Sequence, residues 1–130
     1  MKRRNWILLL ACICLLGFSC QNSKKKNTPE AVTESFAKAF YTADFTHMYE
    51  YTTKKSDIAV KTMQNAMKNH QERLEEIKNN KVVFDSITVE TCTDSTATCV
   101  TAVKINDVPR QDKWDLLKEN DEWKVTLVLP

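Results

Sequence analysis

The hydrophobic periodicity of the chain changes once, near Asn80, and this change limits the folds that the chain can adopt. Before that point apolar residues recur every three or four positions, as Val32, Phe36 and Phe40 do, which is typical of a helix with one buried face. Helices followed by strands predict an α+β domain, with the helices packed on one face of a four-stranded antiparallel sheet. Beyond Asn80, four segments are rich in β-branched and aromatic residues and indicate the strands: 82–92, 97–105, 111–118 and 122–129.

The helical part of the sequence divides into about three helices. Residues 28–30 (Thr-Pro-Glu) supply an N-cap, a proline at the first helical position and an acid in the first turn, so the first helix begins there. Asp44 breaks this helix and can cap a short second helix that carries Phe45 and Met48. A long third helix is expected over 56–79, and its apolar stripe consists of Val60, Met63, Met67, His70, Leu74 and Ile77.

The chain has a single glycine, Gly17, and it lies in the N-terminal segment ahead of these helices. A glycine-rich phosphate loop and a dinucleotide-binding turn both need glycine, for their backbone conformations and for close approach of the ligand. These two classes of nucleotide site are therefore excluded from the domain. Turns that require a positive φ must use Asn or Asp instead, and three pairs stand at suitable places: Asn79-Asn80, Asn106-Asp107 and Asn120-Asp121.

The N-terminal segment has the pattern of an export signal. Three basic residues at 2–4 precede an apolar run of 13 residues, Trp6–Phe18, whereas a helix needs ~20 apolar residues to cross a bilayer. The small residues Gly17 and Ser19 come just before Cys20, where polar sequence begins. This arrangement resembles the lipobox of bacterial lipoproteins. The resemblance implies that the thiol of Cys20 receives a diacylglycerol, that the signal is cut before it, and that the new amino group is acylated.

Other interpretations of this boundary stay open. Gly17 stands three residues before Cys20, at the position where a lipobox usually has Leu, Val or Ile. Residues 9–12 (Leu-Leu-Ala-Cys) fit that rule better, but a cut there would leave too short an apolar region before it and an exposed apolar end after it. The segment could also be an ordinary secretory signal with an incidental thiol, or an uncleaved signal that anchors the chain. We favour lipidation of Cys20, because a cysteine at that boundary has no other evident role.

The expected organisation is a cleaved signal at 1–19, a lipidated, lysine-rich tether at 20–27, and one domain at 28–130. Six of the 19 basic residues precede Thr28, which leaves 13 basic against 17 acidic side chains and a net charge of −4 in the domain. A nucleic-acid surface needs a clustered basic face, so no nucleic-acid partner is expected. The expected location is the cell envelope, with the lipid anchor in the outer membrane and the domain facing the periplasm.

The order of elements and two quoted segments resemble a known superfamily. The first two helices ("FAKAFYTADFTHMYEYT"), a long middle helix, and four strands ending in "DEWKVTLVL" are similar to the nuclear transport factor 2-like superfamily, and within it to small lipoproteins of Bacteroidota. The resemblance implies a curved sheet wrapped by helices into a cone, often with an apolar cavity at its wide end. Members include isomerases, dehydratases, polyketide cyclases and non-catalytic binding or dimerising modules, so a homodimer is one assembly that it allows.

A cavity of that kind could hold an acid–base group, and four side chains are candidates for that role: His70, Asp44, Tyr41 and Tyr49. His70 interrupts an apolar stripe, but a histidine at the margin of a stripe is more often a structural residue, and Asp44 is better explained as a helix cap. No catalytic residue is therefore assigned, and His70 stays a weak candidate. Two histidines without a cysteine cluster argue against a structural zinc site, and no cofactor is expected. The residues that could line such a cavity are Phe36, Phe40, Tyr41, Tyr49, Met67, His70, Trp114 and Trp123. Five of these aromatic residues (Phe36, Phe40, Tyr41, Trp114 and Trp123) are of a kind that is more often found in a core than in contact with a ligand.

Cys92 and Cys99 are the thiols that remain after signal cleavage and lipidation, and export would place them in an oxidising compartment. If Ser95-Thr96 is a two-residue hairpin loop, the two cysteines are directly opposed, with Cα atoms ~4.5–5.5 Å apart, and a disulfide can form. A different register would put Ile87 on the face of Val103. Cys99 would then be a small buried hydrophobe and Cys92 an exposed thiol. Both alternatives stay open, with a slight preference for the disulfide.

The sequence therefore predicts a lipid-anchored envelope protein with one folded α+β domain. Its expected role is binding or assembly, with a small apolar ligand or a protein as the partner. The alternative is a small cavity enzyme, an isomerase or a hydrolase, with His70 as its acid or base. The two classes differ in one structural feature, since the enzyme needs His70 to open into an enclosed cavity.

Overall fold

The structure of this protein is a computed structural model that describes residues 27–128. The order of its elements confirms the α+β prediction, because helices come first and strands follow. The helices are α2 (Pro29–Tyr41), α3 (Phe45–Tyr51), α4 (Asp57–Met67) and α5 (Gln71–Lys78), with a short 3₁₀ helix, η1 (Lys54–Ser56), before α4. The strands are β1 (Val82–Cys92), β2 (Thr96–Ile105), β3 (Val108–Glu119) and β4 (Glu122–Thr126).

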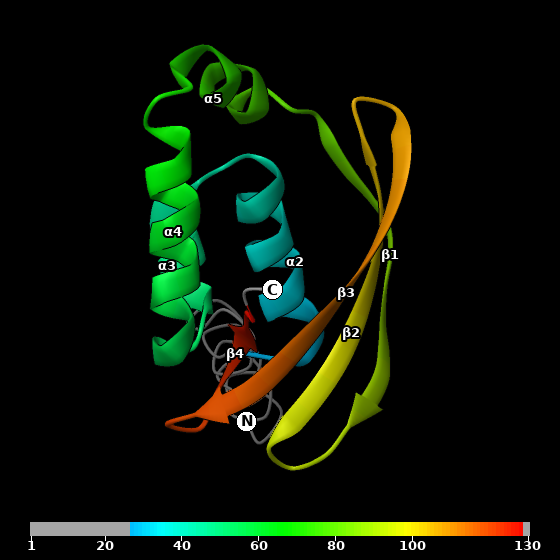
Figure 1. The fold of residues 1–130 in the computed structure, drawn as a ribbon. Helices are drawn as coiled ribbons and strands as arrows, with labels where there is room; N and C mark the ends of the chain where they lie inside the picture. Colours follow the sequence, from blue (N-terminus) through cyan, green and yellow to red (C-terminus); the bar gives the residue numbers. More distant parts are fainter. Residues whose placement is uncertain (1–26, 129–130) are drawn as a thin grey trace, which may run out of the picture.

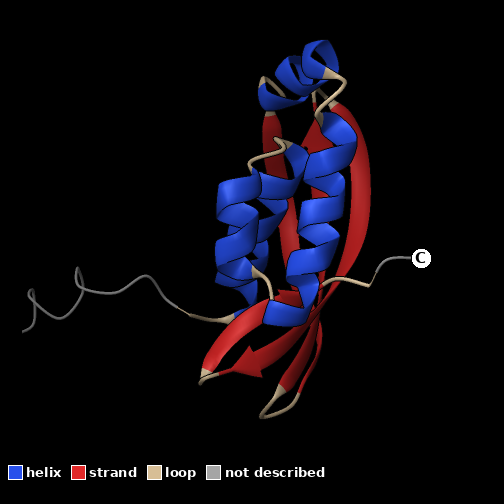
Figure 2. Ribbon diagram, turned by 60° about the vertical axis from the view of Figure 1, so that its left-hand side comes forward, coloured by secondary structure: helices blue, strands red, loops and turns tan. Residues whose placement is uncertain are grey.

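The strands form one antiparallel sheet in the order β1-β2-β3-β4, so each strand pairs with the next one along the chain. The sheet curves along its length, and α2 to α5 lie on one face of it (Figure 2). Helix α2 lies nearest to the sheet, α3 and α4 lie beyond it, and α5 crosses the end of the domain (Figure 1). Because helices cover only one face of the sheet, buried and more exposed residues alternate along β2. Ala97, Cys99 and Val103 are among the buried ones.

The hydrophobic core lies between α2 and the concave face of the sheet and continues under α3 and α4. Phe36 on α2 and Met48 on α3 are fully buried, as are Val60 on α4 and the strand residues Leu116 and Val125. These residues come from both halves of the sequence, so the helical part and the sheet share one core. Burial of side chains of this size stabilises the fold by about 1.5–3 kcal/mol each.

The predicted long third helix is two helices, α4 and α5, separated by Lys68, Asn69 and His70. The amide of His70 donates to the carbonyl oxygen of Met67 at 3.1 Å, which closes a turn in place of another helical turn. Asn and His have weak helix propensity, so interrupting the helix at these residues costs little free energy. The bend lets α5 cross the end of the domain toward β1 (Figure 1), whereas a straight helix would carry the chain away from the sheet.

Two of the three predicted positive-φ turns are confirmed. Asn106 and Asp107 have φ values of 51° and 68° between β2 and β3, and Asn120-Asp121 has values of 52° and 63° between β3 and β4. The prediction for Asn79 is wrong, since its φ is −92° and it forms the C-cap of α5. Ala43 adopts a φ of 51° that the sequence did not indicate. Its backbone is strained, because a Cβ atom disfavours the left-handed region.

The hairpin between β1 and β2 has a register that does not oppose the two cysteines. Val89 pairs with Cys99, and Cys92 pairs with Ala97, while the amide of Thr93 donates to the carbonyl oxygen of Thr96 at 2.8 Å. Both cysteines are free thiols in this structure, Cys92 exposed and Cys99 buried, which agrees with the alternative register and not with the disulfide. The inward face sets this register, because it brings Ile87 and Val89 over the core.

Candidate functional site

The turn between α2 and α3 forms one wall of the candidate site. Helix α2 ends in a Schellman arrangement, in which the amide of Asp44 donates to the carbonyl oxygen of Ala39 at 2.8 Å and the amide of Ala43 donates to that of Phe40 at 3.3 Å. Asp44 then caps α3, since its Oδ1 accepts a hydrogen bond from the amide of His47 at 3.3 Å. These bonds fix the direction in which the chain leaves α2 and enters α3.

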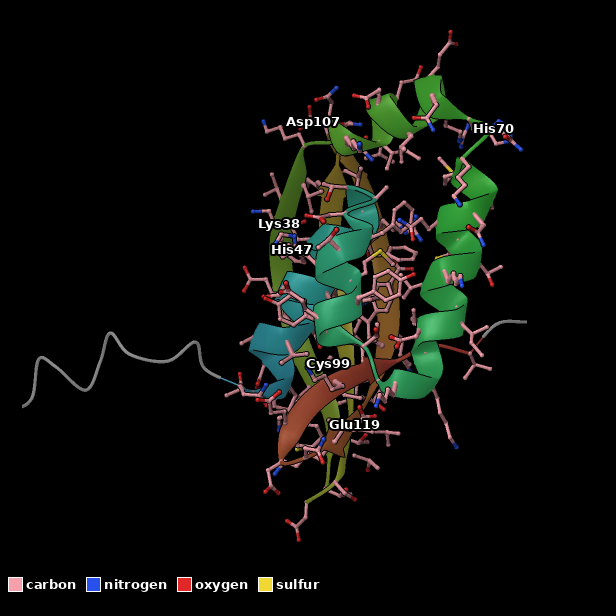
Figure 3. All side chains as sticks on the ribbon, turned by 90° about the vertical axis from the view of Figure 1, so that its left-hand side faces the viewer. Lys38, His47, His70, Cys99, Asp107 and Glu119 are labelled. Carbon is pink, nitrogen blue, oxygen red and sulfur yellow. The ribbon has the colours of Figure 1, made fainter. Side chains whose placement is uncertain are left out.

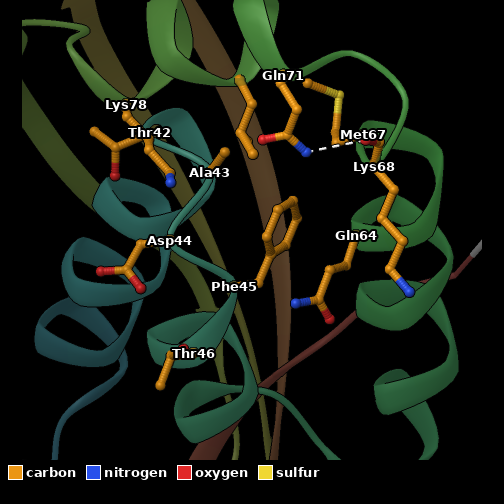
Figure 4. Close-up of a pocket in the computed structure, with 11 residues that line it drawn as sticks. Thr42, Ala43, Asp44, Phe45, Thr46, Gln64, Met67, Lys68, Gln71 and Lys78 are labelled. Carbon is orange, nitrogen blue, oxygen red and sulfur yellow. Dashed lines mark hydrogen bonds between the residues drawn. The ribbon is translucent and has the colours of Figure 1, made fainter.

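A hollow of about 540 Å³ opens between this turn, α4 and α5, and we call it the main hollow (Figure 4). Phe45 projects into its centre from the start of α3 (Figure 4). Met67 at the end of α4 and Leu74 on α5 also line it, and all three side chains are half-buried. The main hollow therefore offers apolar surface from three helices to whatever enters it. The sequence indicated Met67 as a lining residue but missed Phe45 and Leu74.

The rim of the main hollow is polar. The side-chain amide of Gln71 donates to the carbonyl oxygen of Lys68 at 2.9 Å, across the bend between α4 and α5 (Figure 4). Gln64 accepts a hydrogen bond from the hydroxyl of Tyr49 at 3.3 Å, which joins α4 to α3. Lys78 lies 3.6 Å from a carboxylate oxygen of Glu75 on its own helix. These contacts hold the rim and leave the apolar interior accessible.

A second hollow of about 320 Å³ lies on the other side of the same turn, and Thr42 and Asp44 line both hollows. Lys38 from α2 and His47 from α3 lie next to each other in it (Figure 3). Nδ1 of His47 is 2.5 Å from Oδ2 of Asp44, so the carboxylate orients the imidazole ring. Ser35 also lines the second hollow, which is consequently the more polar of the two.

Apart from the two hollows, a cluster of polar side chains lies on the concave face of the sheet. There the phenol of Tyr41 donates a hydrogen bond to the carboxylate of Asp112. Arg110 also holds this carboxylate, with Nε 2.6 Å from Oδ2, and its guanidinium lies 5.3 Å from the centre of the Tyr41 ring. Burial, and then the hydrogen bond to Asp112, raise the pKa of Tyr41 to about 12. Sequence reasoning missed Asp112 and Arg110, although their spacing with Trp114 places all three on one strand face.

The sequence matches no protein-family model and no curated protein. Among solved structures, the chain is similar to a Campylobacter jejuni crystal structure, at 2.00 Å resolution, for which an NTF2-like fold and a transpeptidase activity are proposed. The TM-score is 0.55 and the sequence identity is 20%, over 78% of this chain and 99% of that one. The fold is NTF2-like. At this identity the similarity extends to the fold alone, and an NTF2-like fold is compatible with a binding module or a small enzyme.

The interior of this NTF2-like domain is packed with aromatic side chains, so these residues form a core and not a cavity lining. The ring of Trp114 lies 5.2 Å from Phe36 and 5.2 Å from Phe40, both edge-on. Tyr41 and Trp123 are also buried in this core, and Tyr49 packs against it. Of the eight residues expected to line a cavity, Met67 lines the main hollow, and six of the others are core or core-flanking residues.

The remaining residue, His70, is exposed at the bend between α4 and α5, at the outer edge of the domain (Figure 3), and does not line the main hollow. It forms the N-cap of α5, and the surface around it is made by residues 68–73 of the same segment. An acid or base there has no enclosed cavity in which to act on a substrate. The enzyme alternative therefore loses the residue on which it depended.

Within residues 27–128, no three His, Cys, Asp or Glu side chains converge closely enough to hold a metal ion. Asp44 and His47 lie within hydrogen-bond distance, but they form only a pair. In the same part of the chain, no helix is long and apolar enough to cross a membrane.

Proposed function

We propose that this chain is a lipid-anchored cell-envelope protein whose NTF2-like domain is a non-catalytic binding module. Its ligand places an apolar group in the main hollow. The observation that carries this proposal is the half-buried apolar surface of Phe45, Met67 and Leu74, gathered from three helices into a hollow of about 540 Å³. A hollow of this size is within the range of small-molecule sites, and this one combines three apolar side chains with a polar lining.

The anchor in this proposal rests on the N-terminal sequence. Basic residues, a short apolar run and small residues end at Cys20, and a polar, lysine-rich segment follows. A hydrogen bond at the end of this segment supports a domain that begins there, since the side-chain oxygen of Asn27 accepts from the amide of Trp123 at 2.6 Å. Two or more acyl chains on Cys20 would hold the protein at a membrane, since each buried CH₂ contributes ~0.8 kcal/mol.

Membrane fractionation of a Cys20→Ser variant in a bacterial host tests the anchor. We expect the variant domain in the soluble periplasmic fraction, or an unprocessed precursor, because the acyl acceptor is gone. The wild-type chain, processed in the same host, is the control. A processed Cys20→Ser chain that still fractionates with membranes contradicts lipidation.

Binding of a neutral apolar probe, 1-dodecanol, tests the main hollow in the chain from residue 20 onward with Cys20→Ser. Leu74→Gln and Met67→Gln each remove apolar contact area, so we expect about tenfold weaker binding. Ile58→Gln is the matched control, because Ile58 is 71% exposed on α4 and does not line the main hollow. Circular dichroism confirms that each variant is folded. Equal effects of all three substitutions, or no binding by the parent chain, contradict the proposal.

A further inference from the structure

The main hollow and the second hollow are neighbours on the two sides of one turn, and both are lined by Thr42 and Asp44. They differ in chemistry. Phe45 and Met67 give the main hollow an apolar interior, whereas the second hollow is lined by hydroxyl, ammonium and imidazole groups. A ligand that fills both must therefore have an apolar part and a polar part, joined over the turn between α2 and α3.

The polar part must suit the charges of the second hollow. Lys38 brings an ammonium group, and no carboxylate of residues 27–128 lies within salt-bridge distance of it. Asp44 is the acidic residue of this hollow, but its two oxygens are already engaged, one by the amide of His47 and the other by its ring. Asp44 keeps its negative charge, so an incoming anion must lie at the Lys38 end of the second hollow, where the ammonium group attracts it.

Hydroxyl groups complete the second hollow. Ser35 and Tyr51 line it, and neither hydroxyl has a hydrogen-bond partner within the described part of the chain. Each can donate a hydrogen bond to an oxygen atom of a ligand. One cation and two free donors around one hollow suit a head group with several acceptor oxygens, such as a carboxylate or a phosphate.

We propose that the two hollows form one site for a single-chain amphiphile with an anionic head group. The alkyl chain lies against Phe45, Met67 and Leu74, and the carboxylate or phosphate lies at Lys38, Ser35 and Tyr51. This inference rests on the proposed binding function and adds the class and orientation of the ligand. The volumes of about 540 and 320 Å³ are each within or close to the range of small-ligand sites.

Four amphiphiles with the same twelve-carbon chain test the head group: dodecanoate, dodecyl phosphate, 1-dodecanol and dodecyltrimethylammonium. Isothermal titration calorimetry, below the micelle-forming concentration, measures each against the chain from residue 20 onward with Cys20→Ser. We expect at least one anion to bind about tenfold more tightly than 1-dodecanol, and the cation to bind most weakly. The two anions distinguish a carboxylate head group from a phosphate one.

Lys38→Gln tests the position of the head group. We expect it to remove the preference for the anion and to leave the affinity for 1-dodecanol unchanged, because the alkyl chain does not contact it. Lys61→Gln is the matched control, since Lys61 is exposed on α4 and lines neither hollow. The double variant Ser35→Ala, Tyr51→Phe should reduce the same preference without a change of charge.

Three results overturn this inference. Equal affinity for 1-dodecanol and both anions shows that the head group is not recognised, and in that case the proposed apolar site still stands. Loss of the anion preference in Lys68→Gln, with Lys38→Gln unaffected, places the head group at the opposite end of the main hollow (Figure 4). Failure of all four amphiphiles to bind overturns both this inference and the proposed function.

Discussion

The phenol of Tyr41, in the last turn of α2, donates a hydrogen bond to the carboxylate of Asp112 on β3. Seventy-one residues separate these two side chains in the sequence. Tyr41 is 4% exposed, while the Asp112 side chain is 24% exposed and also holds Arg110. The bond therefore fastens the C-terminal end of α2 to the sheet, next to the turn that forms the wall of both hollows.

Tyr41→Phe should lower the free energy of unfolding by about 1 kcal/mol, because it removes a hydrogen bond to a charged group and leaves the ring packing intact. Water and Arg110 can still reach Asp112, which keeps the loss modest. Urea unfolding at pH 7 measures the effect. Tyr49→Phe is the control, since the hydroxyl of Tyr49 makes an exposed bond of 3.3 Å, and its loss should cost less than about 0.5 kcal/mol. A Tyr41→Phe variant as stable as wild type contradicts the structural role.

The same phenol predicts a dependence of stability on alkaline pH. The pKa of Tyr41 is about 12 in the folded domain, against 10.0 for an ordinary tyrosine. The stability that the protonated phenol contributes is therefore complete below pH 10 and is lost as the pH rises toward 12, because the unfolded chain ionises first. The loss should be on the order of 2 kcal/mol.

Comparison of wild type with Tyr41→Phe isolates this effect from the other tyrosines and the lysines, which both proteins share. Urea unfolding at intervals between pH 9 and 12 should show the wild-type free energy falling more steeply than that of the variant. The absorbance of phenolate should in parallel show one tyrosine of wild type that ionises late. Parallel stability curves for the two proteins are incompatible with a raised pKa at Tyr41.

The sequence predicted those features of the fold that depend on local patterns. The cap at Thr28, with its Oγ1 accepting from the amide of Ala31 at 3.2 Å, and the cap at Asp44 follow from residue type and position. The order of helices and strands follows from the periodicity, and two of the hairpin turns follow from their Asn-Asp pairs. Each of these features is decided by residues a few positions apart.

The candidate site was less predictable, because its parts meet only through tertiary packing. An inward aromatic residue can line a cavity or fill it, and the sequence does not distinguish the two; Trp114 and Phe40 fill the interior by packing on each other. The bend at Asn69 turns α5 over Phe45, and no strong breaker such as proline or glycine marked it. The main hollow exists because of that bend.

Ala43→Gly should stabilise the domain by about 0.5–1 kcal/mol. Ala43 lies at the C′ position of α2 with a φ of 51°, where glycine has no Cβ to clash, and this gain exceeds the entropy that glycine loses on folding. Thermal unfolding measures the change. Ala66→Gly, at an exposed helical position of α4, should instead destabilise the domain by up to about 1 kcal/mol. Destabilisation by both substitutions would show that the buried methyl group of Ala43 matters more than its backbone strain.

The register of the first hairpin predicts how the two domain cysteines react with a thiol reagent. In the chain from residue 20 onward with Cys20→Ser, Cys92 should react at once in the folded protein, because its thiol is exposed. Cys99 is fully buried, and burial also raises the pKa of its thiol, so it should react only after unfolding. The expected count is one thiol per folded chain and two per unfolded chain. The Cys92→Ser variant, which should show one thiol only after unfolding, assigns the two reactions. An unfolded, unreduced chain with no reactive thiol would mean that the cysteines are bridged after export, and that the hairpin pairs in the register that opposes them.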